Sequence, residues 1–345
     1  MQTLVQRAWQ AGASDIHLQM RGNTAEVAFR LDGVLTAVTQ LPAPLAERVI
    51  GRIKFLARLK TYQDSLPQDG RIERTELNSP YDLRVATYPT VTGEKIVLRL
   101  FTSTAAKTLR ELNSPESATA ELELVLRRAS GLLLLTGPAG SGKTTTIYAC
   151  LRHLVESGGR HIITVEDPVE QILPGIMQTE INEAVGLDFA RAARHLLRQD
   201  PQVLVIGEIR DEATAQLAVR AGLTGHLVIS TLHAGSCQGV LERLVSLCPD
   251  TSAVAAALEM VVNQRLLRQL CPHCQGTQCE RCLRTGYAGR TPIMEWLRIT
   301  DAVRDQIRRR NFASLVSPVS LAAAARELVA QGRSNESELQ RVLGL

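Results

Sequence analysis

The chain has 345 residues, of which 21% are charged and 45% are hydrophobic, and its formal net charge is +4. This length accommodates two domains, and the composition is that of an ordinary globular protein, which excludes a disordered or fibrous chain. The small positive charge does not call for a polyanionic partner, and aromatic residues at 3% argue against a stacking platform for single-stranded nucleic acid.

The chain carries no signal that would direct it into or across a membrane. No apolar run approaches the roughly 18 residues needed to span a bilayer, and the opening "MQTLVQRAWQ" lacks the basic start and apolar core of a secretory signal. The sequence therefore predicts a cytoplasmic protein, in which thiols are kept reduced.

The first hundred residues predict a small α+β domain that ends near residue 101. A short helix is expected over residues 1 to about 20, ending in "GASDIHLQ", and "LAERVIGRIKFLARL" has the apolar spacing of a second helix. Strands are expected in "AEVAFRLDGVL", "YDLRVATYPT" and "EKIVLRLF", where apolar and polar residues alternate. The polar residues 102–117 are expected to be a linker.

From about residue 118 the pattern changes to helices that alternate with short apolar strands. The runs "GLLLLTG", "HIITVED", "VLVIGEIRD" and "HLVISTLHA" are typical of buried strands. This alternation predicts a doubly wound parallel sheet over residues 118–265, with ligand chemistry at the carboxyl ends of the strands. Residues 266–345 are expected to hold a cysteine segment and a small helical bundle formed by "WLRITDAVRDQIRRR" and "SLAAAARELVAQG".

The stretch "GPAGSGKT" follows a predicted strand, precedes a predicted helix and satisfies the pattern G-x-x-x-x-G-K-[ST]. Backbone N–H groups of such a loop converge on phosphates, the lysine neutralises their charge, and the final hydroxyl ligates Mg²⁺. The sequence therefore predicts a nucleoside triphosphate site. The residues expected to bind the nucleotide are Gly137, Pro138, Ala139, Gly140, Ser141, Gly142, Lys143, Thr144 and Thr145, with Thr144 as the magnesium ligand.

Titratable residues also lie at the ends of the other predicted strands of this sheet. Among them, "VLVIGE" has the form of a Walker B element, whose acid organises Mg²⁺. Hydrolysis needs a base, a metal-organising acid and a cation, and all three types are present. These residues are Glu166, Asp167 and Glu170 after the second run, Glu208, Arg210 and Asp211 after the third, and His226 and His233 around the fourth.

Four cysteines form the spacing C-x2-C-x4-C-x2-C within residues 271–282. Each pair turns two thiolates toward one ion, and four thiolates suit tetrahedral Zn²⁺ in a structural site. Reduced structural cysteines are the alternative reading. The predicted zinc ligands are Cys271, Cys274, Cys279 and Cys282.

Together these segments resemble the ATPases of type II secretion and type IV pilus assembly, a hexameric RecA-like family. The resemblance is carried by "GASDIHLQ", "RLDGVL", "LPQDGRI", "YDLRVATYPTVTGEKIVLRL", "VEDPVE", the stretch from "LLRQDPQ" to "STLHA", and the cysteine pairs followed by "RTGYAGR". It implies a RecA-like core behind a small PAS-like α+β domain. The spacer between the cysteine pairs is shorter than the family's usual one. The stretch that matches the family begins after the family's first N-terminal domain, so the chain is expected to be either a short member or a truncated product.

The resemblance implies a role for each candidate catalytic residue. Glu166 would position or deprotonate the attacking water and Glu208 would hold Mg²⁺ through water, although the sequence does not rank these two acids. His226 and His233 would contact the γ-phosphate region. Arg84 and Arg99 would act as arginine fingers that reach the γ-phosphate from the first domain, so that hydrolysis is coupled to domain movement.

The implied function is a cytoplasmic motor that hydrolyses ATP to assemble a pilus or pseudopilus. Its implied partners are further copies of itself in a homo-hexamer and a polytopic platform protein of the inner membrane, to which it would be peripheral. The cofactors would be ATP, Mg²⁺ and Zn²⁺, and no direct contact with nucleic acid is expected. The alternatives are a conjugation-type nucleic-acid translocase, a pilus retraction motor and a non-hydrolysing scaffold.

Overall fold

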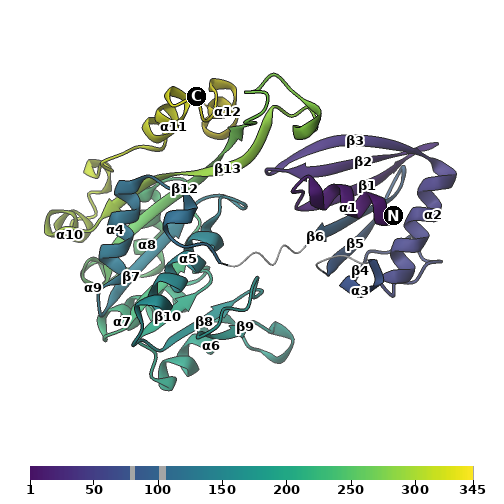
Figure 1. Ribbon diagram of the computed structural model, residues 1–345. Coiled ribbons are helices and arrows are strands. Elements are labelled where there is room, and N and C mark those ends of the chain that lie inside the picture. Colours follow the sequence, from purple (N-terminus) through teal and green to yellow (C-terminus); the bar gives the residue numbers. More distant parts are fainter. Residues whose placement is uncertain (78–81, 101–105, 345) are drawn as a thin grey trace. The chain divides into compact units, whose positions relative to one another are not determined.

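The computed structural model describes residues 1–77, 82–100 and 106–344, and the chain folds into two compact units. The first unit comprises Met1–Thr104 together with Arg268–Arg290, and the second comprises Ala105–Leu267 together with Thr291–Leu345. Figure 1 shows the elements of both. Within the described ranges, every helix is too short or too polar to span a bilayer.

The first unit is built on a six-stranded sheet in the order β3-β2-β1-β6-β5-β4, and the neighbouring strands run antiparallel. The elements of this unit before its cysteine segment are α1 (Gln2–Gln10), β1 (Asp15–Arg21), β2 (Thr24–Leu31), β3 (Val34–Pro42), α2 (Ala43–Leu56), β4 (Gln68–Ile72), α3 (Arg74–Leu77), β5 (Leu83–Thr90) and β6 (Gly93–Leu100).

Alternation along these strands sends one set of side chains into a core and the other set to the opposite face. In β1, Ile16 and Leu18 are buried in the core, whereas His17 and Gln19 lie on the other face and are half-buried. Helices α1 and α2 contribute to the same core, so both cover the apolar face of the sheet (Figure 1). The opposite face is polar, and it carries both predicted arginine fingers.

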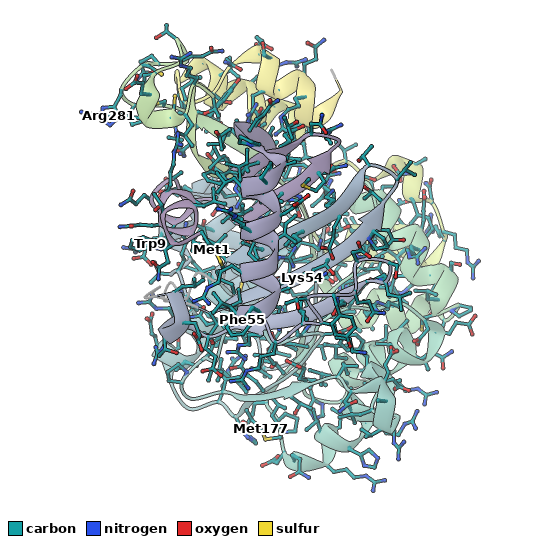
Figure 2. All side chains as sticks on the ribbon, turned by 90° about the vertical axis from the view of Figure 1, so that its right-hand side faces the viewer. Met1, Trp9, Lys54, Phe55, Met177 and Arg281 are labelled. Carbon is teal, nitrogen blue, oxygen red and sulfur yellow. The ribbon has the colours of Figure 1, made fainter. Side chains whose placement is uncertain are left out.

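Helix α2 buries a lysine, Lys54, and exposes the phenylalanine that follows it, Phe55. Lys54 is 1% exposed, and its Nζ donates to Glu94 Oε1 at 2.9 Å and to the carbonyl oxygen of Gln63 at 2.6 Å. Its neighbour Phe55, labelled beside it in Figure 2, is 64% exposed. Because the buried ammonium is paired and hydrogen-bonded, the helix tolerates a lysine on its inner face.

The cysteine segment belongs to the first unit. Leu283 lies against the first unit's core, and the backbone N–H of Gly289 donates to Asp32 Oδ2 at 2.9 Å. The sequence predicts one C-terminal part over residues 266–345, but the structure divides that stretch at Arg290.

The second unit contains a seven-stranded sheet in the order β13-β12-β7-β11-β10-β8-β9, with parallel pairing from β12 through to β9. The predicted parallel sheet is thereby confirmed. Its strands are β7 (Gly131–Thr136), β8 (Ile162–Glu166), β9 (Met177–Glu180), β10 (Val203–Ile206), β11 (Leu227–Thr231), β12 (Leu258–Leu270) and β13 (Tyr287–Arg298), the last two running on into the first unit.

Helices cover both faces of this sheet, because its central strands are apolar on both sides (Figure 1). In β7, Leu132 and Leu134 face one core and Leu133 and Leu135 face the other. On the second of these faces lie α4 (Glu116–Leu126) and α5 (Lys143–Ser157); on the first lie α6 (Phe189–Leu196), α7 (Glu212–Leu223), α8 (Cys237–Leu247) and α9 (Thr251–Ala257).

The C-terminal helices do not form one bundle. Helix α10 (Asp301–Arg308) packs on the core beside α9, whereas α11 (Leu321–Ala330) and α12 (Glu336–Leu343) share a small separate cluster. The start of "WLRIT" was predicted to be helical and is instead the end of β13, because Trp296 and Leu297 continue the strand that borders β12.

Two further predictions, on the first helix and on the linker, need correction. The first helix ends at Gln10, and "DIHLQ" belongs to β1, where it pairs with both β2 and β6. Part of the expected linker lies outside the described residues, but Leu109 and Leu112 are buried in the second unit's core and α4 begins at Glu116. The described part of residues 102–117 is therefore packed structure.

The remaining short elements connect these parts. They are the 3-10 turns η1 (Arg110–Leu112), η2 (Glu183–Val185), η3 (Leu197–Gln199), η4 (Glu280–Cys282) and η5 (Phe312–Ser314).

Candidate active site

A cavity of ≈ 290 Å³ lies in the second unit, beside the residues that follow the carboxyl ends of β7, β8, β10 and β11. Parallel strands bring these ends to one edge, which is where ligands bind in such sheets. The lining includes most of the predicted acids as well as part of the glycine loop. The residues are Ala139, Gly140, Lys143, Thr144, Ile147, Tyr148, Glu166, Asp167, Pro168, Glu170, Phe189, Val205, Gly207, Glu208, Arg210, Thr231 and His233.

The glycine loop of residues 137–144, called here the phosphate loop, joins β7 to α5. Gly140 and Gly142 adopt φ values of +74° and +87°, which a residue with a side chain rarely takes, so both positions require glycine. The Lys143 Nζ donates to the carbonyl oxygens of Gly137 at 2.8 Å and Pro138 at 3.1 Å. The loop therefore curls around its own lysine at the N-terminus of α5.

The predicted nucleotide residues divide into two groups. Ala139, Gly140, Lys143 and Thr144 line the cavity. The others, Gly137, Pro138, Ser141, Gly142 and Thr145, belong to the loop and the first turn of α5 but do not line it. Burial lowers the pKa of Lys143, the charge of Arg265 lowers it further, and nearby Glu208 opposes both effects.

Glu166, the last residue of β8, is 6% exposed and is held by three donors. Thr164 Oγ1 donates to its Oε1 at 2.5 Å, Gln178 Nε2 donates to the same oxygen at 3.0 Å, and the Tyr148 hydroxyl donates to Oε2. These bonds satisfy much of the carboxylate's accepting capacity and fix its direction. The acid is therefore preorganised at the cavity wall.

Tyr148 also anchors the segment that follows β8. Its hydroxyl accepts from the backbone N–H groups of Glu170 at 3.2 Å and Gln171 at 3.4 Å while it donates to Glu166. Burial, followed by the hydrogen bond to Glu166, raises the pKa of this phenol. The hydroxyl consequently keeps its proton, which the bond to the carboxylate needs.

Glu208, after β10, contacts an arginine and a histidine that also line the cavity. Arg210 Nε donates to Glu208 Oε2 at 2.9 Å, and His233 Nε2 lies 3.1 Å from Glu208 Oε1. The hydrogen bond to Glu208 is the main reason that the pKa of Arg210 is raised. Arg210 also lies 3.8 Å from Asp167 and rests over the Phe189 ring, so it connects the ends of β8 and β10.

His226 is not brought to this cavity. It precedes β11, at the end of the strand opposite His233, and its Nδ1 lies 3.2 Å from the carbonyl oxygen of Ala221 and 3.4 Å from Thr224 Oγ1. Within the described second unit, His226 therefore belongs to the turn after α7, and only His233 of the two predicted histidines meets the acids.

Arg84 and Arg99 lie directly opposite each other on β5 and β6 of the first unit. Arg99 is also opposite Asp15 on β1, and its Nε donates to Asp15 Oδ1 at 3.0 Å. Asp15 is 4% exposed and receives Arg30 on its other oxygen at 3.4 Å, whereas the Arg99 side chain is 65% exposed. A buried carboxylate thus anchors one of the two arginines and leaves much of that side chain in solvent.

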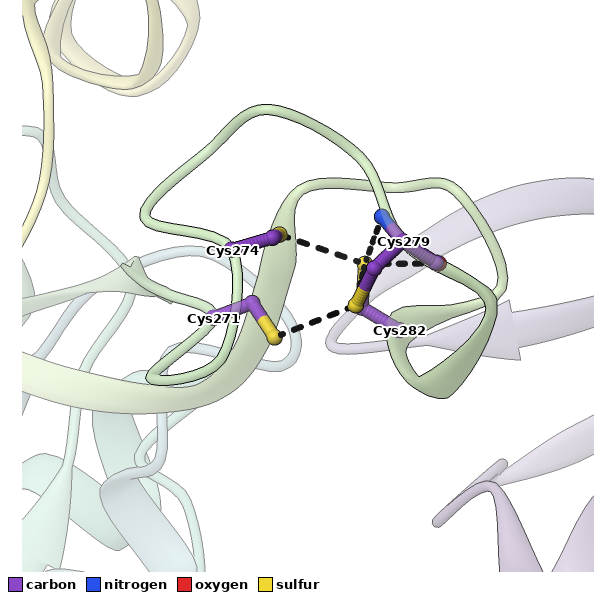
Figure 3. Close-up of side chains that lie close together, drawn as sticks. All are labelled: Cys271, Cys274, Cys279 and Cys282. Atoms are coloured by element: carbon purple, nitrogen blue, oxygen red, sulfur yellow. Dashed lines mark hydrogen bonds between the residues drawn. The ribbon is translucent and has the colours of Figure 1, made fainter.

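The four cysteines gather as the spacing predicts, with all sulfur atoms within 4.8 Å of one another (Figure 3). The Sγ–Sγ distances are 3.9 Å for Cys271–Cys279 and for Cys274–Cys282, and 3.7 Å for Cys279–Cys282. A tetrahedron with metal–sulfur bonds of about 2.3 Å has edges of about 3.8 Å. The donor set and its spacing therefore fit a tetrahedral ion such as Zn²⁺.

Backbone amides also point at these sulfurs. The N–H groups of Cys279 and Gly286 donate to Cys282 Sγ at 3.4 and 3.3 Å. Burial alone would raise the pKa of the Cys282 thiol, but these hydrogen bonds and the neighbouring thiols outweigh it and lower that pKa to about 6. Stabilising the thiolate is what a metal ligand requires.

Three residues that hold site candidates in place are not predicted by the sequence motifs. Tyr148, Gln178 and Asp15 were not singled out, although each makes a short contact with a catalytic candidate or a predicted arginine finger. Their spacing to these partners is long-range and carries no local motif. The available signals were a tyrosine among the apolar positions of α5 and an acid inside the apolar start of β1.

Comparison with known proteins places these features in a family. Residues 1–341 match the family described as "Type II/IV secretion system protein". The chain is 39% identical over 355 residues to the "Type II secretion system protein HxcR" of Pseudomonas aeruginosa, covering 98% of this chain and 76% of that protein. It is 37% identical over 380 residues to the "Type IV pilus assembly ATPase TfpB" of Acinetobacter baylyi, covering 99% of this chain and 64% of that protein.

A solved structure of the "Pilus Retraction Motor PilT and Bound ADP" has the same fold, with a TM-score of 0.69 and 25% identity over 99% of this chain and 96% of that one. The chain spans 76% and 64% of the lengths of the two relatives named above. With a family match over nearly all its residues and relatives close to 40% identity, the chain belongs to the Type II/IV secretion system protein family of ATPases.

Proposed function

We propose that this chain is the ATPase subunit of a motor that assembles a type IV pilus or a type II secretion pseudopilus. The observation that carries the proposal is the cavity at the carboxyl ends of the strands, where Lys143, Glu166, Glu208 and His233 line one space beside the phosphate loop. A loop for phosphates, a fixed acid and a second acid paired with an arginine are parts that phosphoryl transfer to water requires.

ATP binding is assigned to the phosphate loop and the start of α5. The loop N–H groups and the positive end of the helix dipole attract the phosphates, and Lys143 exchanges its bonds with Gly137 and Pro138 for phosphate oxygens. Thr144 and Glu208 supply oxygen donors of the kind that Mg²⁺ takes, and both line the cavity. Bound Mg²⁺ would neutralise charge on the phosphate oxygens.

Hydrolysis is assigned to the two acids and to the two arginines of the first unit. Glu166 would accept a proton from the attacking water or orient that water, and Glu208 would hold Mg²⁺ through water. Arg84 and Arg99 would stabilise the charge that develops on the transferred phosphoryl group when the two units close. His233, 3.1 Å from Glu208, would report the state of the γ-phosphate region to the end of β11.

We further propose that the chain works as a homo-hexamer on the cytoplasmic face of the inner membrane, against a polytopic platform protein. A closed ring needs a heterologous interface, so that closure of one subunit is passed to the next. The family membership supports this arrangement.

A retraction motor is the second candidate, because the fold matches that of the pilus retraction motor PilT with a TM-score of 0.69. The four cysteines and "TGYAGR" support assembly, since the sequence resemblance associates both with assembly motors. Deleting the gene in its own host separates the two: loss of surface fibres supports assembly, whereas an excess of fibres supports retraction.

The ATPase ring predicts a rate that depends on protein concentration. Purified chain with Mg²⁺ and ATP is expected to release phosphate with a specific activity that rises as subunits associate, because in the proposed ring closure of one subunit is passed to the next. Phosphate release measured beside sedimentation at the same concentrations checks this. Specific activity that is constant while the oligomer dissociates would contradict the ring.

The cysteine site predicts one zinc ion per chain. Chelation, or Cys274→Ser, is expected to remove the ion and to increase hydrogen–deuterium exchange across residues 268–290, because a metal holds such small segments folded. Elemental analysis and exchange mass spectrometry measure both effects. Cys248→Ser, a change of a buried cysteine outside the cluster, is the control that keeps the metal. Metal-free wild-type protein with unchanged exchange would rule out the site.

A further inference from the structure

Gln264, on β12, is 2% exposed and has no part in the function proposed above. Its position follows from strand register. Strand β12 runs parallel to β7, with Asn263 opposite Thr136, so the next residue of β12 lies where β7 gives way to the phosphate loop. The side chain of Asn263 bonds elsewhere, to the carbonyl oxygen of Gly235 and to Glu295.

Both the nitrogen and the oxygen of the Gln264 side-chain amide make hydrogen bonds. Its Nε2 donates to the carbonyl oxygen of Ser141, inside the phosphate loop, at 2.7 Å. Its Oε1 accepts from Thr146 Oγ1, on the first turn of α5, at 2.8 Å. One buried side chain therefore joins the loop and the helix that follows it to a strand from a distant part of the sequence.

The glycines of the loop are packed against the same residue. A Cβ at Gly137 would lie 2.4 Å from the carbonyl oxygen of Gln264, and a Cβ at Gly142 would lie 2.8 Å from its Nε2. Both distances are too short for a real contact, so the glycines allow the loop to approach β12 this closely. The loop has no room to move toward β12 while Gln264 is in place.

We propose that Gln264 is a positioning residue for the phosphate loop, holding its amides in the arrangement that receives the nucleotide phosphates. The residue does not line the cavity and acts through Ser141 and Thr146. The inference rests on the proposed nucleotide site, because a braced loop matters to binding only if the loop binds phosphate. A loop fixed in advance loses less freedom when the nucleotide binds, which raises affinity.

The test is Gln264→Met, which keeps the length of the side chain and removes both hydrogen bonds. Affinity for MgADP, measured by titration calorimetry, is expected to fall about tenfold, the factor that follows from losing a buried hydrogen bond and leaving its partner unpaired. The KM for ATP is expected to rise by a similar factor while kcat changes less, because the loop contacts the nucleotide before and during the reaction. Gln238→Met, which removes an exposed hydrogen bond to Glu242 within α8, is the matched control.

The Thr146 bond gives an independent check if Gln264→Met does not fold. Thr146→Val keeps the shape of the side chain and loses the hydroxyl, whereas Thr146→Ser keeps the hydroxyl. The valine variant is expected to weaken MgADP binding several-fold more than the serine variant. In the folded double variant, the losses from Gln264→Met and Thr146→Val are expected to be less than additive, because each removes the same bond.

The outcomes separate this inference from the proposed nucleotide site. If wild-type protein does not bind MgADP, or Lys143→Ala binds it equally well, the nucleotide site itself is wrong. If wild type binds and Lys143→Ala does not, a Gln264→Met affinity within twofold of wild type overturns the positioning role. A loss confined to kcat, or equal binding by the valine and serine variants of Thr146, also overturns it.

Discussion

Replacing Arg84 or Arg99 by alanine is expected to lower the rate of ATP hydrolysis by about three to five orders of magnitude, which is the contribution of arginine fingers in related phosphoryl-transfer reactions. The physical reason is that a guanidinium placed at the transferred phosphoryl group stabilises charge that develops only in the transition state. MgADP affinity is expected to stay close to that of wild type. Single-turnover hydrolysis and calorimetry measure the two quantities.

The matched control for this pair is Arg21→Ala. Arg21 lies on the same sheet, is largely exposed and pairs with Glu26, so its loss removes one surface charge without touching the proposed fingers. Arg84→Lys and Arg99→Lys are expected to hydrolyse ATP little faster than the alanine variants, because an ammonium lacks the planar fork of donors of a guanidinium. Hydrolysis by either alanine variant within tenfold of wild type would show that the two arginines are surface residues of the first unit.

Replacing Glu166 by glutamine is expected to lower hydrolysis at least a hundredfold at every Mg²⁺ concentration, because the water loses the group that orients or deprotonates it. The new amide nitrogen must also face Tyr148, Thr164 or Gln178, all of which donate to the native carboxylate. Glu208→Gln is expected to lower the rate too, but with a rise in the Mg²⁺ concentration that gives half the maximal rate. Single-turnover hydrolysis across a Mg²⁺ titration distinguishes the two.

Glu166→Gln and Glu208→Gln serve as controls for each other in the Mg²⁺ titration. If Glu166→Gln shifts the Mg²⁺ requirement and Glu208→Gln does not, the assigned roles are exchanged and the account of Glu166 as the acid nearest the water is wrong. Tyr148→Phe is a milder change for comparison with Glu166→Gln, because it keeps the carboxylate. It removes one hydrogen-bond donor to Glu166 and the acceptor for the N–H groups of Glu170 and Gln171.

Contiguous patterns were sufficient to predict the phosphate loop and the cysteine cluster. The loop needs glycines with positive φ at fixed offsets before a lysine, and the cluster needs two pairs of cysteines at fixed spacing, so both are written into a few adjacent residues. The parallel sheet followed from apolar runs such as "LLLL" of β7, which is buried on both faces. These features depend on local chemistry.

Features that depend on distant contacts were not predictable in this way. The sequence assigned one role to His226 and His233, but the five residues of β11 lie between them, and only the carboxyl end of a parallel strand meets the cavity. Likewise, the cysteine spacing predicted the metal ligands but not what the segment packs against, because Leu283 packs on a core formed by residues between Val5 and Leu100. The sequence predicts Asp15 at the end of a helix, whereas the structure places it at the start of β1, paired with Arg30 and Arg99.

The central claim is that the phosphate loop binds a nucleoside triphosphate whose hydrolysis powers the chain. Its most direct test is phosphate release from ATP by purified wild-type protein and by Lys143→Ala, each with Mg²⁺ under conditions in which the wild type oligomerises. The account predicts steady release by the wild type and none above background by the variant, because Lys143 is the cation inside the loop. Equal release by both proteins would contradict it.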